Sequence, residues 1–144
     1  MLRRVHPIAG TIGFLTILTF WTSTIATELF GSVNMVVAVK QTIPWGFLIL
    51  APALAITGAS GLRMAGASSD PRVQSKKFRM RFIAANGLLI LMPAAFYLAS
   101  LASRGEFGGL FYGVQAVEIV AGAVNLALML LNIRDGLRLT GRLK

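Results

Sequence analysis

The sequence predicts an all-α membrane protein in which four transmembrane helices form a bundle and residues 1–144 form one domain. Four apolar stretches, residues 7–30, 34–62, 82–101 and 110–133, each contain the roughly 20 residues that a helix needs to cross a bilayer core. Charged side chains make up only 13% of the chain, against roughly 25% in soluble domains. The segments between the stretches are short, so we expect no separate extramembrane domain.

The first stretch resembles a secretory signal peptide in two respects. Arg3 and Arg4 precede the apolar run, and Thr24-Ile25-Ala26 is similar to a cleavage site. However, the run is longer than the about 7–15 apolar residues of a signal peptide. We therefore expect residues 7–30 to remain in the protein as its first transmembrane helix.

Pro44 leaves two interpretations of the second stretch. Proline suits the first turn of a helix, so Thr42-Ile43-Pro44 could begin a helix and leave residues 34–40 as a separate interfacial segment. Alternatively, one long helix passes through Pro44 with a kink, because neighbouring groups in a membrane bundle can satisfy the freed carbonyl. An internal similarity to the fourth stretch, described below, favours the continuous helix.

The longest predicted loop covers residues 65–77, where Gly66 and the run Ser68-Ser69-Asp70-Pro71 favour turns. The other two connections are short. Short connections make consecutive helices antiparallel neighbours, so the first helix should pack on the second and the third on the fourth.

The basic residues are distributed unequally between the two sides of the predicted bundle. Lys40 and Arg104 lie on one side, and twelve of the fourteen lysines and arginines lie on the other: Arg3, Arg4, Arg63, Arg72, Lys76, Lys77, Arg79, Arg81, Arg134, Arg138, Arg142 and Lys144. Basic residues resist translocation, which predicts that both termini and the long loop lie in the cytoplasm. Because these charges lie beside the spans, we expect contact with anionic lipid and no binding of nucleic acid.

The two halves of the chain show a weak internal repeat. Arg4, Gly10, Phe30 and Gly31 match Arg81, Gly87, Phe107 and Gly108 at one constant offset. If the repeat is a true duplication, the bundle consists of two parallel helix hairpins related by an axis along the membrane normal.

Small and amide side chains predict how the helices associate. Small residues four apart let helix backbones approach closely in lipid. They form the stripes Ala51-Ala55-Ala59 and Ala53-Thr57-Gly61 in the second stretch and Ala95-Ala99-Ser103 in the third. The interpretation we favour is contact between these two helices, and the alternative is a homodimer face. We expect Asn86, Asn125 and Asn132 to form hydrogen bonds between helices, and Arg134 and Asp135 to be solvated.

Four polar residues near the outer ends of the stretches, Glu28, Lys40, Gln115 and Glu118, form a candidate intramembrane site. Glu118 lies about two turns, or roughly 10 Å, inside the fourth stretch, a depth at which ionisable residues are functional candidates. One interpretation is a structural ion pair with Lys40, either direct or through Glu28 or Gln115. The other is a carrier site for a proton or small solute. Buried charges are usually paired, which favours the first.

The residues that most enzymes need do not form a recognisable constellation in this sequence. The chain has no cysteine and a single histidine, His6, so thiol chemistry and multi-histidine metal sites within one chain are excluded. We find no nucleophile–base pair, no paired carboxylates and no phosphate-binding glycine loop. We therefore expect a protein that is not an enzyme, and we interpret His6 first as an interfacial residue near the start of the first helix.

Over its whole length the chain resembles an uncharacterised family of short four-span bacterial inner-membrane proteins, through the motifs His6-Pro7-x-x-Gly10, Phe20-Trp21, Glu28-Leu29-Phe30-Gly31, Ile43-Pro44-Trp45-Gly46, Phe82-Ile83-Ala84-Ala85-Asn86-Gly87 and Arg134-Asp135-Gly136-Leu137-Arg138. This resemblance implies the topology and no activity.

A second, local resemblance concerns His6–Gly10, which is similar to helix starts in small b-type membrane cytochromes. In those proteins a histidine, with a glycine one turn later, makes room for a haem. The resemblance implies haem b with His6 as axial ligand, and Met80 or a second subunit would supply the other position. Those families use several histidines, so the single histidine excludes bis-histidine ligation within one subunit.

Three functions follow as expectations. The first is a small non-enzymatic inner-membrane protein that binds a partner, an apolar ligand or haem in support of a membrane redox or transport system. We expect it to be a homo-oligomer or an accessory to a larger membrane complex. The alternatives are a haem b cytochrome that uses His6 and a proton or small-solute carrier that uses Glu118.

Overall fold

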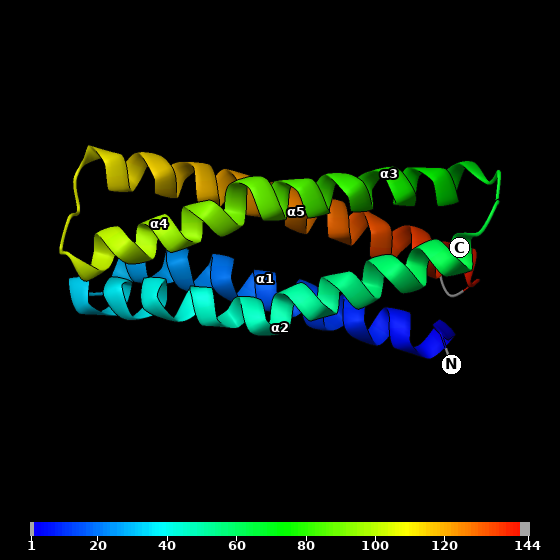
Figure 1. Cartoon of the computed structure of the whole chain (residues 1–144), viewed down its shortest axis with the longest axis horizontal. Helices are drawn as coiled ribbons and strands as arrows, with labels where there is room; N and C mark the ends of the chain where they lie inside the picture. The colour runs from blue at the N-terminus through cyan, green and yellow to red at the C-terminus, as the bar shows by residue number, and fades with distance from the viewer. Residues whose placement is uncertain (1, 142–144) are drawn as a thin grey trace.

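Four long helical rods lie side by side in the computed structural model, which describes residues 2–141 (Figure 1). The third rod is divided by a short π-helical segment, η1. The elements are α1 (Leu2–Phe30), α2 (Val33–Ala65), α3 (Pro71–Asn86), η1 (Gly87–Leu91), α4 (Met92–Ser103) and α5 (Gly109–Leu139).

All four rods are long and apolar enough to cross a membrane, over Arg4–Phe30, Val33–Ala65, Pro71–Ser103 and Gly109–Leu139. The predicted fold class, an all-α bundle of four transmembrane helices, is therefore confirmed. The rods extend beyond the predicted spans because their polar ends continue the helix past the apolar stretch that a hydropathy pattern detects.

The third rod begins earlier than the sequence predicts, and the expected loop at residues 65–77 is wrong over its second half. α3 starts at Pro71, and the side chain of Asp70 caps it by accepting a hydrogen bond from the Arg72 amide at 2.8 Å. Proline at the first helical position needs no hydrogen-bond partner, and an aspartate before it satisfies a free amide. The turn-forming residues before Pro71 suggested a solvated loop, whereas capping by Asp70 makes the residues after it a helical extension.

The start of α1, the end of α5 and the turn between α2 and α3 lie at one end of the bundle (Figure 1). This basic end, defined by residues 2–6, 60–81 and 134–141, is opposite the outer end, where α1 joins α2 and α4 joins α5. The two halves are thus up-and-down hairpins with the same direction, as the repeat implies. Whether they arose by duplication stays a prediction.

α2 passes through Pro44 and Pro52 as one helix, so the continuous interpretation is confirmed and a separate segment at residues 34–40 is wrong. A proline cannot donate to the carbonyl four residues earlier. Close to Pro44, the side chain of Gln41 donates to the Ala99 carbonyl of α4 at 2.6 Å, which attaches α2 to the third rod.

α2 and the third rod pack together, as we expected, but the stripe Ala53-Thr57-Gly61 is directed at another helix. It faces α1: a side-chain carbon at Gly10 would lie 3.5 Å from Thr57, one at Gly13 would lie 3.9 Å from Ala53, and one at Gly61 would lie 3.0 Å from His6. The other stripe, Ala51-Ala55-Ala59, is exposed. The four-residue spacing of small residues predicted that another helix could approach α2 closely. It could not predict which helix that would be.

Candidate intramembrane polar site

One face of α5 carries a row of polar side chains through the interior of the bundle. Residues three or four apart share a helix face, and this face is buried or half-buried along its whole length. Its polar members are Gln115, Glu118, Asn125, Asn132 and Asp135. The sequence prediction treated them as two separate groups, although their spacing already indicated one continuous face.

Lys40 and Glu118 form the predicted ion pair between α2 and α5, through Lys40 Nζ and Glu118 Oε2. Their side chains are only 1% and 12% exposed. Lys40 Nζ also lies 3.5 Å from Thr24 Oγ1 on α1, so one ammonium group connects three helices. The α2 helix positions Lys40 one turn before Pro44, and the polar face of α5 positions Glu118.

Glu28 and Gln115, the other two members of the candidate site, are not hydrogen-bonded to this pair. Glu28 Oε1 and Gln115 Oε1 are both buried and accept no hydrogen bond from any residue between 2 and 141. A buried acceptor without a donor is destabilising by about 1–3 kcal/mol. The four residues therefore consist of one satisfied ion pair and two acceptors that lack a partner.

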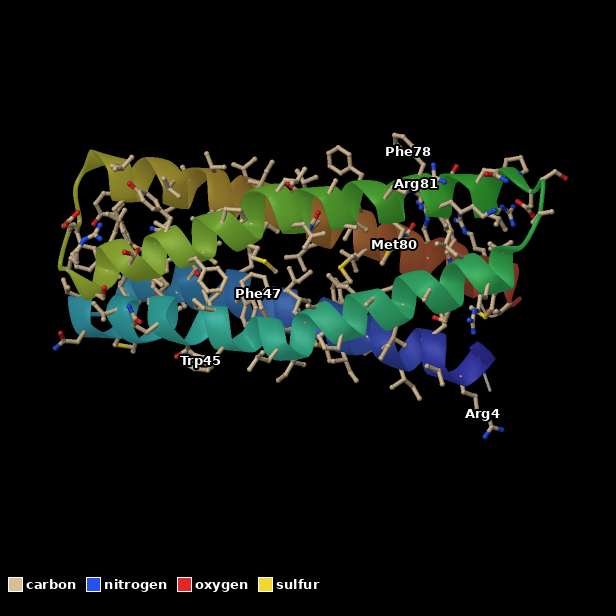
Figure 2. The ribbon with its side chains drawn as sticks, in the orientation of Figure 1. Arg4, Trp45, Phe47, Phe78, Met80 and Arg81 are labelled. Carbon is tan, nitrogen blue, oxygen red and sulfur yellow. The ribbon has the colours of Figure 1, made fainter. Side chains whose placement is uncertain are left out.

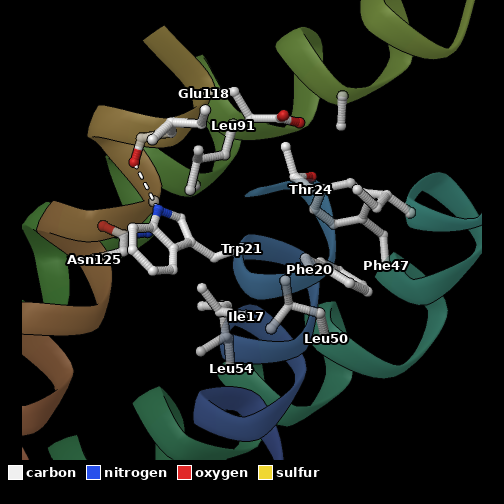
Figure 3. A pocket seen from close by; sticks show the side chains of 15 residues that line it. Ile17, Phe20, Trp21, Thr24, Phe47, Leu50, Leu54, Leu91, Glu118 and Asn125 are labelled. Atoms are coloured by element: carbon white, nitrogen blue, oxygen red, sulfur yellow. Dashed lines mark hydrogen bonds between the residues drawn. The ribbon is translucent and has the colours of Figure 1, made fainter. Parts of the chain in front are cut away.

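A cavity of about 60 Å³ lies between α1, α2, the third rod and α5, directly beside this pair. Figure 3 shows Phe20, Phe47, Leu50 and Leu54 on its apolar walls. The polar groups that line it are Thr24, Glu118 and Asn125. The cavity thus extends from Glu118 of the ion pair to the apolar residues Ile17 and Leu50 of the core.

Two glycines allow aromatic rings to form the cavity walls. A side-chain carbon at Gly122 would lie 2.9 Å from Trp21 Cδ1, and one at Gly46 would lie 2.1 Å from Phe20 Cζ. The space left by Gly122 lets Trp21 Nε1 donate to the Ile119 carbonyl of α5 at 2.9 Å, which is the dashed line in Figure 3. This hydrogen bond joins α1 to α5 at the cavity wall.

Asn86 and Asn125 cross-link α3 to α5 next to the cavity. Asn86 Nδ2 donates to Asn125 Oδ1 at 2.8 Å and to the Ala121 carbonyl at 2.9 Å, and Asn125 Nδ2 donates to the Ile83 carbonyl at 3.4 Å. The predicted interhelical role of these two residues is confirmed. Because their hydrogen bonds are made within the protein, we assign them a structural role.

Asp135, which we expected to be solvated, is buried at the basic end. Arg79 donates to Asp135 Oδ2 through both Nη1 and Nη2 at 2.8 Å, and Arg134 Nη2 donates to Oδ1 at 3.1 Å. Asn132, also predicted to bond between helices, accepts from Arg79 Nη1 at 3.0 Å. Arg79 reaches Asp135 because α3 continues as a helix beyond the apolar stretch, the feature that the sequence prediction missed.

His6 and Met80 both contact α2 at the basic end. His6 Nδ1 lies 3.1 Å from the Thr57 carbonyl and 3.0 Å from Ser60 Oγ, and we assign the ring nitrogen as donor because Ser60 itself donates to the Ile56 carbonyl. Met80 lies between α3 and α2 (Figure 2), where its methyl group would be 3.7 Å from a side-chain carbon at Gly58.

These positions do not fit a haem bound within one chain. One nitrogen of His6 is engaged by α2, and neither His6 nor Met80 lines the cavity. The cavity, at about 60 Å³, is smaller than the roughly 150 Å³ that holds a benzene molecule. Over residues 2–141 the structure also has no group of three or more His, Cys, Asp or Glu side chains that could hold a metal ion. Ligation between two subunits stays a prediction.

Comparisons with models of protein families, with curated proteins and with solved structures find no match to this chain. The function is therefore inferred from the geometry of the bundle.

Proposed function

We propose that this chain is a non-enzymatic protein of the bacterial inner membrane that binds a small, largely apolar ligand inside its bundle, in support of a membrane redox or transport system. The cavity beside Glu118 carries this proposal. Ligand sites are concave and mainly apolar, with a few polar groups that orient the ligand, and the lining described above has this composition.

A row of aromatic rings connects the cavity to the lipid-facing surface. Phe20 and Phe47 line the cavity and pack edge to face at 6.2 Å. Phe47 stacks on Phe96, also at 6.2 Å, and Phe96 is 54% exposed. A molecule dissolved in the bilayer would meet Phe96 first, so we propose lateral entry between α2 and α4.

The size and chemistry of the cavity restrict the ligand. A volume of about 60 Å³ admits a slender apolar group and excludes a large ring system. The ionic group of Glu118 and the hydroxyl of Thr24 lie at its wall, where they can bond to a polar head. We therefore propose a narrow apolar chain that carries one hydrogen-bonding group.

We also propose how the bundle is oriented in the membrane and what surrounds it. The basic end would lie in the cytoplasm against anionic lipid headgroups, because basic residues resist translocation. The exposed stripe Ala51-Ala55-Ala59 supports association with a second copy or with a larger complex, since small residues let helices approach closely in a bilayer.

Tryptophan fluorescence tests the cavity. The chain has two tryptophans: Trp21 lines the cavity, and Trp45 is 73% exposed and points away from the bundle (Figure 2). In a Trp45→Phe background, a short bromoalkane should quench Trp21 saturably. Ala95→Val, which adds two carbons to the cavity wall, should remove the saturable component.

The matched control is Ala99→Val, one turn along the same helix at a buried residue that does not line the cavity. It should leave saturable quenching intact. Quenching that is linear and equal in all three proteins would show that the bromoalkane reaches Trp21 from the lipid, and it would contradict the proposed site.

A second candidate, a carrier of protons or small solutes, is favoured by one observation: Glu118 is both an ion-pair partner and part of the cavity wall. A carrier that uses Glu118 should lose transport in reconstituted vesicles when Glu118 is replaced by glutamine. Binding without transport in the wild type would leave the first proposal and eliminate the second.

A further inference from the structure

The two acceptors without donors, Glu28 Oε1 and Gln115 Oε1, lie on helices that face each other. α1 and α5 run in opposite directions, and they meet where Trp21 packs against Gly122. Glu28 is seven residues after Trp21, and Gln115 is seven residues before Gly122. Both steps lead toward the outer end.

Seven residues correspond to nearly two helical turns, so each step moves roughly 10 Å along its helix and returns to almost the same face. Glu28 therefore occupies the face of α1 that Trp21 turns toward α5, and Gln115 occupies the face of α5 that receives Trp21. The two side chains belong to one layer, on the outer side of the Lys40–Glu118 pair.

The two buried oxygens of this layer receive no hydrogen bond: the donor that the pair itself carries, Gln115 Nε2, does not bond to Glu28 in the part of the chain that the structure describes. Gln115 is only 4% exposed, and its Oε1 and Glu28 Oε1 have no hydrogen-bond partner among the described residues. The nearest ammonium group, on Lys40, is directed to Glu118 and Thr24. Arg104, the other basic residue of the outer end, bonds to Glu106 and Ser100 at the surface.

The formal charges of the region point to the same deficit. Lys40 and Glu118 neutralise each other as an ion pair. Glu28 then remains as a carboxylate whose buried oxygen has neither a cation nor a hydrogen-bond donor. Uncompensated charge inside a membrane protein is strongly unfavourable, so a bound species that carries one positive charge would balance the region.

We propose that Glu28 and Gln115 form a site for one exchangeable monovalent cation, either a sodium ion or a proton. Carboxylate and amide oxygens are the ligands that hard cations prefer, and water can complete the coordination of sodium. A proton on the Glu28 carboxyl would instead donate to Gln115 Oε1. The proposal is independent of the apolar ligand, because neither residue lines the cavity.

The test compares the wild type with Glu28→Gln in detergent. Radiolabelled sodium binding and thermal unfolding are measured in sodium chloride and in choline chloride of equal ionic strength. If the ion is sodium, the wild type should bind one sodium per chain. Its Tm should rise by roughly 5–10 °C at a hundredfold excess over Kd, whereas Glu28→Gln should show neither effect.

If the ion is a proton, sodium should have no effect. Difference infrared spectroscopy should then show the carbonyl band of a protonated carboxyl in the wild type, and the band should be missing from Glu28→Gln. Glu106→Gln is the matched control, because Glu106 is an exposed carboxylate at the same end of the bundle. It should behave as the wild type in every measurement.

Gln115→Leu removes the facing oxygen without changing a charge, and it keeps the test decisive if Glu28→Gln fails to fold. It should weaken sodium binding at least tenfold, or shift the carboxyl band through the lost hydrogen bond. A wild type that shows neither sodium binding nor a carboxyl band, or one whose signals persist unchanged in these two variants, would overturn the proposal.

Discussion

At the scale of single residues, the interior contains an ion pair whose two side chains are largely buried. Lys40 is among the most buried side chains of the protein, and its ammonium group is held by Glu118 and Thr24. Replacing both partners of such a pair with apolar residues is often nearly neutral, whereas removing one leaves an unpaired buried charge. We therefore expect the ion pair to fix the position of α2 relative to α5, because any other position would leave unpaired buried charges. We expect it to contribute little net stability.

Glu118→Gln tests this point. Loss of one partner should destabilise the protein by about 3–5 kcal/mol, which thermal unfolding in detergent measures as a lower Tm. The double variant Lys40→Met with Glu118→Met should recover part of that loss.

Glu106→Gln is the comparison, because Glu106 pairs with Arg104 at an exposed site. Exposed pairs contribute about 0–1 kcal/mol, so its Tm should change little. A double variant no more stable than Glu118→Gln alone would contradict the buried-charge explanation.

At the scale of elements, the third rod shows how local chemistry changes a boundary. Asp70 and Pro71 start α3 well before its apolar part, and this extension positions Arg79 to bond with Asp135. Farther along, the backbone widens into the π-helical segment η1, where the Met92 amide donates to the Gly87 carbonyl. Such segments are frequent at functional sites, and Gly87 and Leu91 of η1 line the cavity.

Asp70→Ala tests whether the extension of α3 depends on its cap. Removal of an N-terminal cap costs a helix about 0.5–2 kcal/mol, so the first turns should fray. Limited trypsin digestion should then cleave faster at Arg72, Lys76 and Lys77, while the Tm of the bundle changes little.

Asp70→Asn retains a side-chain oxygen that can cap the helix, and it should be cleaved at the wild-type rate. Equal cleavage in all three proteins would mean that the extension is held by its contacts with α5 rather than by the cap.

At the scale of the whole molecule, the start of α1, the end of α5 and the α2–α3 turn share one end, and most of the basic residues that the structure describes are found toward it. This arrangement predicts that the basic end is cytoplasmic. The absence of cysteine from the sequence makes the orientation directly measurable, because a single introduced cysteine has no background.

Ser69→Cys in the α2–α3 turn and Glu106→Cys in the α4–α5 connection place one thiol at each end. A membrane-impermeant maleimide should label Glu106→Cys in intact cells with a permeable outer membrane. It should label Ser69→Cys only in inverted membrane vesicles. The reverse pattern would refute the proposed orientation.

Several features of the fold and the site could be predicted from the sequence. The four spans follow from hydropathy, and the shared side of the termini follows from the distribution of lysine and arginine. The Lys40–Glu118 pair could be predicted because opposite charges at membrane depth have few other ways to be compensated. Capping by Asp70 was also encoded locally, but Asp70 and Pro71 were interpreted as turn residues instead of as the start of a helix.

Other features were decided only when the helices packed together. The stripe Ala53-Thr57-Gly61 met α1, Asp135 became buried, and Glu28 and Gln115 were each left with a buried oxygen that has no hydrogen-bond partner among residues 2–141. Hydropathy, charge and capping act on each segment separately. The sequence by itself therefore determined the four spans and the fact that the start of α1 and the end of α5 share one side of the bundle. The side chain that a helix face meets depends on rotation and depth relative to its neighbours, and only the tertiary structure determined those contacts.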